Sequence, residues 1–155
     1  MKVLVVEDDD TKRGELIEFV KEYFDVDCVD SARSFQSGLR AIIDSRPDFI
    51  FLDMTMRNFD RTVAEEGGRP HPFAGREILR QMQRNRIKTP VLVVTQFDRF
   101  GEEADYVTLA QLKAELQTKF SNYVGAVQYK SNIDDWKPAI IAAIGGLLPR
   151  RGAGR

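Results

Sequence analysis

Residues 49–53 read Phe-Ile-Phe-Leu-Asp, four large apolar residues followed directly by a carboxylate. A strand in the middle of a parallel sheet is buried on both faces, so its sequence is an unbroken apolar run. Residues 2–6, Lys-Val-Leu-Val-Val, and residues 90–94, Pro-Val-Leu-Val-Val, have the same character. The three runs therefore predict three strands at the centre of one parallel sheet.

Longer amphipathic segments separate these runs. Residues 11–24 carry apolar side chains at helical spacing. Either Ser31 or Ser34 can cap a second helix, which Pro47 ends. Further helices are predicted over residues 75–85, 105–120 and 134–148, and weaker strands over residues 25–29 and 124–129. The alternation predicts an α/β fold of the flavodoxin-like (βα)5 kind, a doubly wound five-stranded parallel sheet with strand order 2-1-3-4-5.

The composition fits one domain of balanced charge. The chain has 155 residues, 43% of them apolar, and its 23 basic and 24 acidic residues leave a net charge of −1. This balance gives no reason to expect direct contact with nucleic acid or an anionic membrane. The N-terminal apolar run is too short for a signal peptide, and no run approaches the roughly 20 residues that cross a bilayer. We therefore expect a cytoplasmic protein.

Polar side chains follow the predicted strands. Glu7 and Asp8 come after the first strand, Asp53 after the third, Thr95 after the fourth and Lys130 after the fifth. Open α/β sheets place their sites at the carboxyl ends of the strands, and these four strands are neighbours in the proposed order. Each residue also has a purely structural interpretation. In that interpretation the acids cap the helices that follow, Thr95 caps the end of its strand, and Lys130 is a solvated surface lysine.

The set nevertheless fits one reaction. Clustered carboxylates repel one another and raise one another's pKa, a conflict that a hard ion such as Mg²⁺ resolves. A carboxylate such as Asp53 can be the nucleophile toward a phosphoryl group, with Asp8 and Glu7 holding the metal. The lysine ammonium of Lys130 and the hydroxyl of Thr95 then stabilise the charge of the transferred group.

The chain resembles the receiver domain of bacterial two-component response regulators. Four motifs carry the resemblance, which covers residues 1–148. They are Val-Val-Glu-Asp-Asp at residues 5–9, Phe-Leu-Asp-Met-Thr-Met at 51–56, Val-Val-Thr at 93–95 and Tyr-Lys-Ser at 129–131. Together, in this order and on these elements, they predict a single-domain response regulator.

The resemblance implies a role for each site residue. Asp53 accepts a phosphoryl group from a sensor histidine kinase or a histidine phosphotransfer protein. Mg²⁺ is bound by Asp8, by Asp53 and by the backbone carbonyl of Thr55, with Glu7 acting through water. The residues implied to contact the phosphoryl group are Thr95 and Lys130. The protein is then a switch that assists its own phosphorylation and dephosphorylation, and signals through protein contacts, with a homodimer as one possibility.

Several departures from the family lie around the site. Residues 56–59 lack the usual proline, and an insertion at about residues 57–74 precedes Gly75. A second insertion spans about residues 97–108. The family's aromatic on the fifth strand is replaced by Val127, and Ser131 replaces the proline after the lysine. These changes predict retained chemistry with a specialised output surface.

The predicted organisation is therefore a receiver domain over residues 1–148 with two insertions, followed by a short basic tail over residues 149–155. A structureless stretch as long as 57–74 is unusual in a compact domain and is often functional. It is either a partner-docking or site-covering element, or a plain loop. Its His71 is either a solvated loop residue, or a ligand or phosphate carrier.

Three other functions are open to this sequence. A degenerate receiver would signal as an adaptor without phosphate. A phosphatase of the haloacid-dehalogenase type also uses an aspartate nucleophile, but Thr55 stands where that family has a second aspartate. A nucleotide- or flavin-binding module would need a glycine-rich loop, and residues 7–10 are acidic instead. The sequence identifies neither the cognate kinase nor the downstream target.

Overall fold

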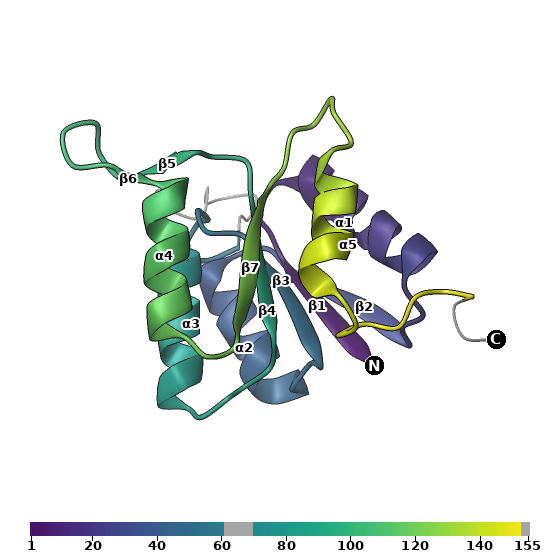
Figure 1. The fold of residues 1–155 in the computed structure, drawn as a ribbon. Helices are drawn as coiled ribbons and strands as arrows, with labels where there is room; N and C mark the ends of the chain where they lie inside the picture. The colour runs from purple at the N-terminus through teal and green to yellow at the C-terminus, as the bar shows by residue number, and fades with distance from the viewer. Residues whose placement is uncertain (61–69, 153–155) are drawn as a thin grey trace.

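A five-stranded parallel sheet forms the middle layer of the protein (Figure 1). The structure is a computed structural model and describes residues 1–60 and 70–152. Its strands, in the order β2-β1-β3-β4-β7, are Cys28–Ala32, Lys2–Val6, Phe49–Leu52, Val91–Thr95 and Tyr123–Gln128. Because β7 is the fifth strand of this sheet, the predicted order 2-1-3-4-5 is confirmed.

Helices cover both faces of the sheet (Figure 1). On one face lie α1 (Asp10–Tyr23) and α5 (Trp136–Ile144). On the other lie α2 (Phe35–Ser45), α3 (Ala74–Arg84) and α4 (Leu109–Lys119). None of the helices in the described ranges is long and apolar enough to cross a membrane.

The central strands contribute side chains to two separate hydrophobic cores, one on each face of the sheet. Ile50 and Leu52 of β3 pack in the cluster on the α2–α3–α4 side, whereas Phe49 and Phe51 pack in the cluster on the α1–α5 side. All four side chains are fully buried. Alternate side chains of a strand point to opposite faces, so burial on both faces requires an apolar residue at every position. This explains the unbroken apolar runs of the sequence.

The largest difference from the sequence prediction lies before α4. The predicted helix over 105–120 begins only at Leu109, where Thr108 and Gln111 form a capping box. The residues before it form a two-stranded antiparallel hairpin, β5 (Arg99–Phe100) with β6 (Val107–Thr108). Strands of two residues are too short to show an alternating pattern, so no sequence pattern predicts this hairpin.

The edge strand also differs, because β2 begins at Cys28 and not at residue 25. The backbone N–H of Asp25 instead donates to the carbonyl of Pro149. Arg151 donates from its backbone to the carbonyl of Tyr23. The first residues of the predicted basic tail therefore pack on the end of α1, while residues 153–155 lie outside the described part. The predicted domain limits at 1–148 stay a prediction.

Candidate functional site

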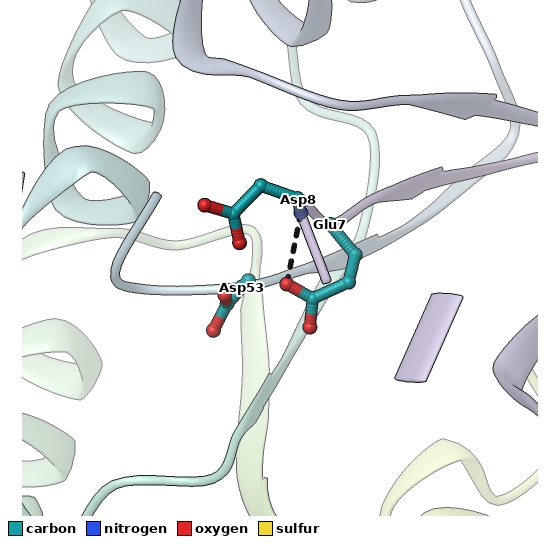
Figure 2. A group of neighbouring side chains, drawn as sticks. All are labelled: Glu7, Asp8 and Asp53. Atoms are coloured by element: carbon teal, nitrogen blue, oxygen red, sulfur yellow. Dashed lines mark hydrogen bonds between the residues drawn. The ribbon is translucent and has the colours of Figure 1, made fainter. Parts of the chain in front are cut away.

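Three carboxylates gather at the carboxyl edge of the sheet (Figure 2). Glu7 and Asp8 follow β1, and Asp53 follows β3, the neighbouring strand. One carboxylate oxygen from each lies within 4.8 Å of the others. The pairing of the strands sets this arrangement, because the N–H of Asp53 donates to the carbonyl of Val6 at 2.9 Å. Topology thus unites residues that are far apart in the sequence.

Backbone amides fix the orientation of these carboxylates. The N–H of Asp8 donates to Glu7 Oε2 at 3.0 Å, the contact drawn in Figure 2. The N–H of Met54 donates to Asp53 Oδ1 at 2.8 Å, and the N–H of Arg57 donates to Asp8 Oδ2 at 3.3 Å. Each carboxylate is therefore held before any ligand arrives.

Glu7 and Asp53 are buried, Asp8 is half-buried, and the three carboxylates repel one another. Burial raises the pKa of Glu7, and the nearby charge of Asp53 raises it further. Burial also raises the pKa of Asp8, again with a contribution from Asp53. Glu7 is 1% exposed and Asp53 4%. A site of this kind favours a cation with oxygen ligands.

One cation already lies beside these acids, and sequence reasoning missed it. The Lys12 ammonium lies 3.2 Å from Asp53 Oδ1, pairs with Glu7 and donates to the carbonyl of Val94 at 2.7 Å. The side chain is 1% exposed. Burial alone would lower the pKa of Lys12, but the charges of Asp53 and Glu7 outweigh it and the net shift is upward. Lys12 therefore stays protonated in the site.

A sequence signal for Lys12 existed in the periodicity of α1. Lys12 precedes Leu16 by four residues and Phe19 by seven, and all three are buried. Residues at this spacing share one helix face. A lysine on the apolar face of a helix that starts beside an acidic edge is a candidate for a buried ion pair.

The predicted lysine, Lys130, lies elsewhere. Its side chain is exposed and lines a groove between β7 and α5, together with Ile133 and Trp136. Among the described residues, the ion pair of Asp53 is with Lys12. The proposed contact of Lys130 with a phosphoryl group stays a prediction.

Tyr129 occupies the end of β7 that faces α1. Its backbone N–H donates to the carbonyl of Thr95 at 2.8 Å, and its hydroxyl donates to Glu15. Burial raises the pKa of Tyr129, and the hydrogen bond to Glu15 adds to the effect. Val127, which the sequence placed at the family's aromatic position, packs on the same α1–α5 side. The residue directly after β7, Tyr129, is a buried aromatic, and its ring centroid lies 5.3 Å from that of Trp136.

The two threonines lie at the same edge of the sheet. Thr95 ends β4, is fully buried, and its hydroxyl oxygen accepts from the N–H of Phe97 at 3.2 Å. Thr55 lies two residues after Asp53, and its hydroxyl donates to the carbonyl of Pro72 at 3.1 Å. The use of the Thr55 backbone carbonyl as a metal ligand stays a prediction.

The first long insertion closes tightly behind Asp53. Met56 and His71 pair as an antiparallel bridge, with the His71 N–H donating to the Met56 carbonyl at 2.8 Å. His71 Nδ1 accepts from the N–H of Phe73 at 3.0 Å, a structural use that favours the plain interpretation of this histidine. Residues 61–69 of the insertion lie outside the described part, so its proposed docking or covering role stays a prediction.

Gly75 then brings α3 against the site. A Cβ at this position would lie 2.4 Å from the carbonyl oxygen of Asp53, and its N–H donates to the carbonyl of Met54 at 2.9 Å. Only glycine permits so close an approach between the helix and the loop. Gly75, which follows the insertion, is therefore required because α3 packs directly against the loop that begins at Asp53.

Comparisons with known proteins agree with this geometry. No family model matches the chain. The protein y4jR of Sinorhizobium fredii, itself uncharacterized, is 41% identical over 143 residues, which cover 90% of this chain and 94% of the relative. The Detocs response regulatory protein DtcB of Enterobacter cloacae is 30% identical over 147 residues, covering 93% and 98%. Among solved structures, the response regulator TrrA of Thermotoga maritima, determined with Mg²⁺ and beryllofluoride, superposes with a TM-score of 0.58 at 16% identity, covering 92% and 97%.

Proposed function

The chain belongs to the response regulator receiver family, and from that premise we propose that it is a phosphorylation switch with Asp53 as the phosphoryl acceptor. The observation that carries the proposal is the gathering of Glu7 and Asp8 around Asp53 at the carboxyl edge of the sheet. Asp53 directly follows β3, the central strand of the sheet, and its carboxylate contacts the buried ammonium of Lys12. This arrangement suits a nucleophile that must receive a charged group.

Mg²⁺ is the proposed cofactor, and Glu7, Asp8 and Asp53 are the residues that would hold it. The donor set consists of carboxylate oxygens, as a hard cation requires. Burial and mutual repulsion raise the pKa of both Glu7 and Asp8, so these carboxylates gain from a divalent counter-ion. When bound, the ion would neutralise charge on the phosphoryl oxygens. The carbonyl of Thr55 is proposed as a further ligand.

The proposed reaction transfers one phosphoryl group. An Asp53 carboxylate oxygen forms a new bond to phosphorus, while the bond between phosphorus and the histidine nitrogen of the donor protein breaks. The bonding electrons leave with the imidazole, which takes up a proton from water. The hydroxyl of Thr95 donates to a phosphoryl oxygen.

The proposed partners are a sensor histidine kinase or a histidine phosphotransfer protein as the donor, and a downstream protein as the target. The switch turns over no free substrate and works in the cytoplasm. Its output passes through protein contacts, and homodimerisation is one route for them.

The test uses acetyl phosphate and Mg²⁺ with intact-mass measurement. The wild-type chain should gain the mass of one phosphoryl group, and Asp53→Asn should gain none. Asp48→Asn is the matched control, since Asp48 is an exposed carboxylate at the opposite end of the same strand. An unmodified wild-type chain, or an adduct that survives Asp53→Asn, would contradict the proposal.

A phosphate-independent adaptor is the second candidate, and one observation favours it. The Lys12 ammonium already compensates the charge of Asp53 and Glu7. One ammonium offsets one of these negative charges, so the site depends less on a metal ion for its stability. The same mass measurement separates the two functions, because an adaptor acquires no phosphoryl group.

A further inference from the structure

Within the described part of the chain, Lys12 is the basic residue that forms an ion pair with Asp53, the proposed phosphoryl acceptor. Its ammonium lies 3.2 Å from Asp53 Oδ1, the oxygen that also accepts from the Met54 N–H. An ammonium carries three N–H donors. The carbonyl of Val94 accepts one of them at 2.7 Å, and the carboxylates of Glu7 and Asp53 face the others. The ammonium is therefore anchored by Val94 and directed at the carboxylate of Asp53.

The start of α1 fixes this position. Asp9 caps the helix by accepting from the backbone N–H of Lys12 at 3.0 Å. Leu16 and Phe19 then pack the same helix face into the α1–α5 core. The Lys12 ammonium lies 5.9 Å from the centre of the Tyr129 ring, which forms one wall of its pocket. A lysine held on a helix in this way is positioned without the entropy cost of ordering an exposed side chain.

Lys130 lies in the turn beyond β7, which ends at Gln128. Its carbonyl accepts from the N–H of Ile133 at 3.3 Å. Val127 and Tyr129 both pack into the α1–α5 core, whereas the Lys130 side chain is outside that core. Consistent with this, Lys130 is exposed and lines the groove beside α5.

We propose that Lys12, and not Lys130, is the lysine that stabilises the phosphoryl group on Asp53. This inference rests on the proposed function, because it assigns a residue to the same reaction. As the Asp53 oxygen bonds to phosphorus, its own negative charge is lost and charge remains on the phosphoryl oxygens. The N–H of Lys12 that faces Asp53 then donates to a phosphoryl oxygen. Lys12 keeps its proton, and the electron pair of the broken bond leaves with the donor.

The test compares the rate of adduct formation with acetyl phosphate at saturating Mg²⁺. Lys12→Met keeps an unbranched side chain one atom shorter and removes the charge, and it should slow the reaction about 100-fold, as loss of one preorganised donor does. Lys130→Met should react nearly as fast as the wild-type chain. Lys21→Met is the matched control, since Lys21 is an exposed lysine on the same helix.

A measurement on the unaltered chain keeps the test independent of folding. Beryllofluoride with Mg²⁺ imitates the phosphoryl group, and its binding should shift the ammonium nitrogen resonance of Lys12 while leaving that of Lys130 in place. The melting temperature of Lys12→Met shows whether the variant remains folded. Where it does not, the resonance shift alone decides between the two lysines.

The outcomes separate this inference from the proposed function. A wild-type chain that acquires no phosphoryl group contradicts the proposed function itself. A reactive wild-type chain with an equally reactive or faster Lys12→Met overturns only the assignment of Lys12. Loss of reaction in Lys130→Met, or a resonance shift at Lys130 alone, also overturns it.

Discussion

Two regions meet at the carboxyl edge of the sheet, and they differ sharply in burial. The carboxylate side consists of Glu7, Asp8, Lys12 and Asp53, of which all but the half-buried Asp8 are buried. The second region, here called the β7 side, consists of Lys130 and Ile133 in the turn after β7 and of Phe97 in the loop after β4. All three are exposed. Most of the chemical groups are therefore held in the buried part of the molecule, whereas the exposed side chains of the β7 side lie on loops.

Burial also explains why substitutions on the two sides should differ in effect. A group that is held by core packing and by a buried ion pair cannot be changed without disturbing stability as well as reaction. An exposed side chain on a loop changes stability little. The predictions below test this contrast, beginning with the largest expected effect.

Removal of Mg²⁺ should have the largest effect, because it acts on the carboxylate side as a whole. With a chelator present, the wild-type chain should form no adduct with acetyl phosphate, since the charges of Glu7, Asp8 and Asp53 then repel the phosphoryl group. Added Mg²⁺ at about 100 times its Kd should raise the free energy of unfolding by about 2.7 kcal/mol. Urea denaturation with and without Mg²⁺ measures this gain.

The control for the metal is a pair of matched substitutions. Asp8→Asn should remove most of the stabilisation by Mg²⁺, whereas Asp30→Asn, at an exposed position of β2, should keep it. Equal responses of the two variants would show that the ion binds outside the carboxylate side.

Gly75→Ala should have the next largest effect. The new Cβ would lie 2.4 Å from the Asp53 carbonyl oxygen, so either α3 or the acceptor loop must move. Overpacking of this kind destabilises by about 1–3 kcal/mol, and the displaced Asp53 should react more slowly. Gly14→Ala is the control, because its Cβ meets nothing within 4 Å and α1 gains helix propensity. A Gly75→Ala chain as stable and reactive as Gly14→Ala would contradict the close packing.

Tyr129→Phe tests the border between the two sides. The change removes the hydroxyl that donates to Glu15 and keeps the ring packed on Trp136. Loss of one such hydrogen bond should lower the free energy of unfolding by about 1 kcal/mol, measured by urea denaturation. Tyr106→Phe, at an exposed tyrosine, is the control and should leave stability unchanged.

Phe97→Ala should have the smallest effect, confined to the β7 side. Phe97 is 42% exposed, so its removal should leave the free energy of unfolding nearly unchanged. Its backbone N–H donates to the Thr95 hydroxyl, so the backbone of Phe97 lies beside the site. Loss of the ring should admit water and shorten the lifetime of the phosphorylated chain a few-fold. Tyr106→Ala is the control, and an unchanged lifetime of Phe97→Ala would refute the shielding role.

Much of the fold was readable from local patterns, but some elements were not. The apolar runs of β1, β3 and β4 follow from burial on both faces, and the sheet order follows from α/β topology. The edge strand β2 is largely exposed, so its apolar pattern is weak and its start was misplaced by three residues. The β5–β6 hairpin has two residues in each strand, and only pairing across space defines it.

The sequence by itself determined the carboxylate half of the site. Glu7, Asp8 and Asp53 stand directly after central strands, and parallel strands carry their carboxyl ends to one edge. The tertiary structure alone decided which lysine reaches Asp53. Lys12 and Lys130 both lie next to strand or helix ends, but the packing of α1 on the sheet buries the first, and the turn after β7 leaves the second exposed. The direction of a side chain depends on how its element packs, and that packing involves residues far away in the sequence.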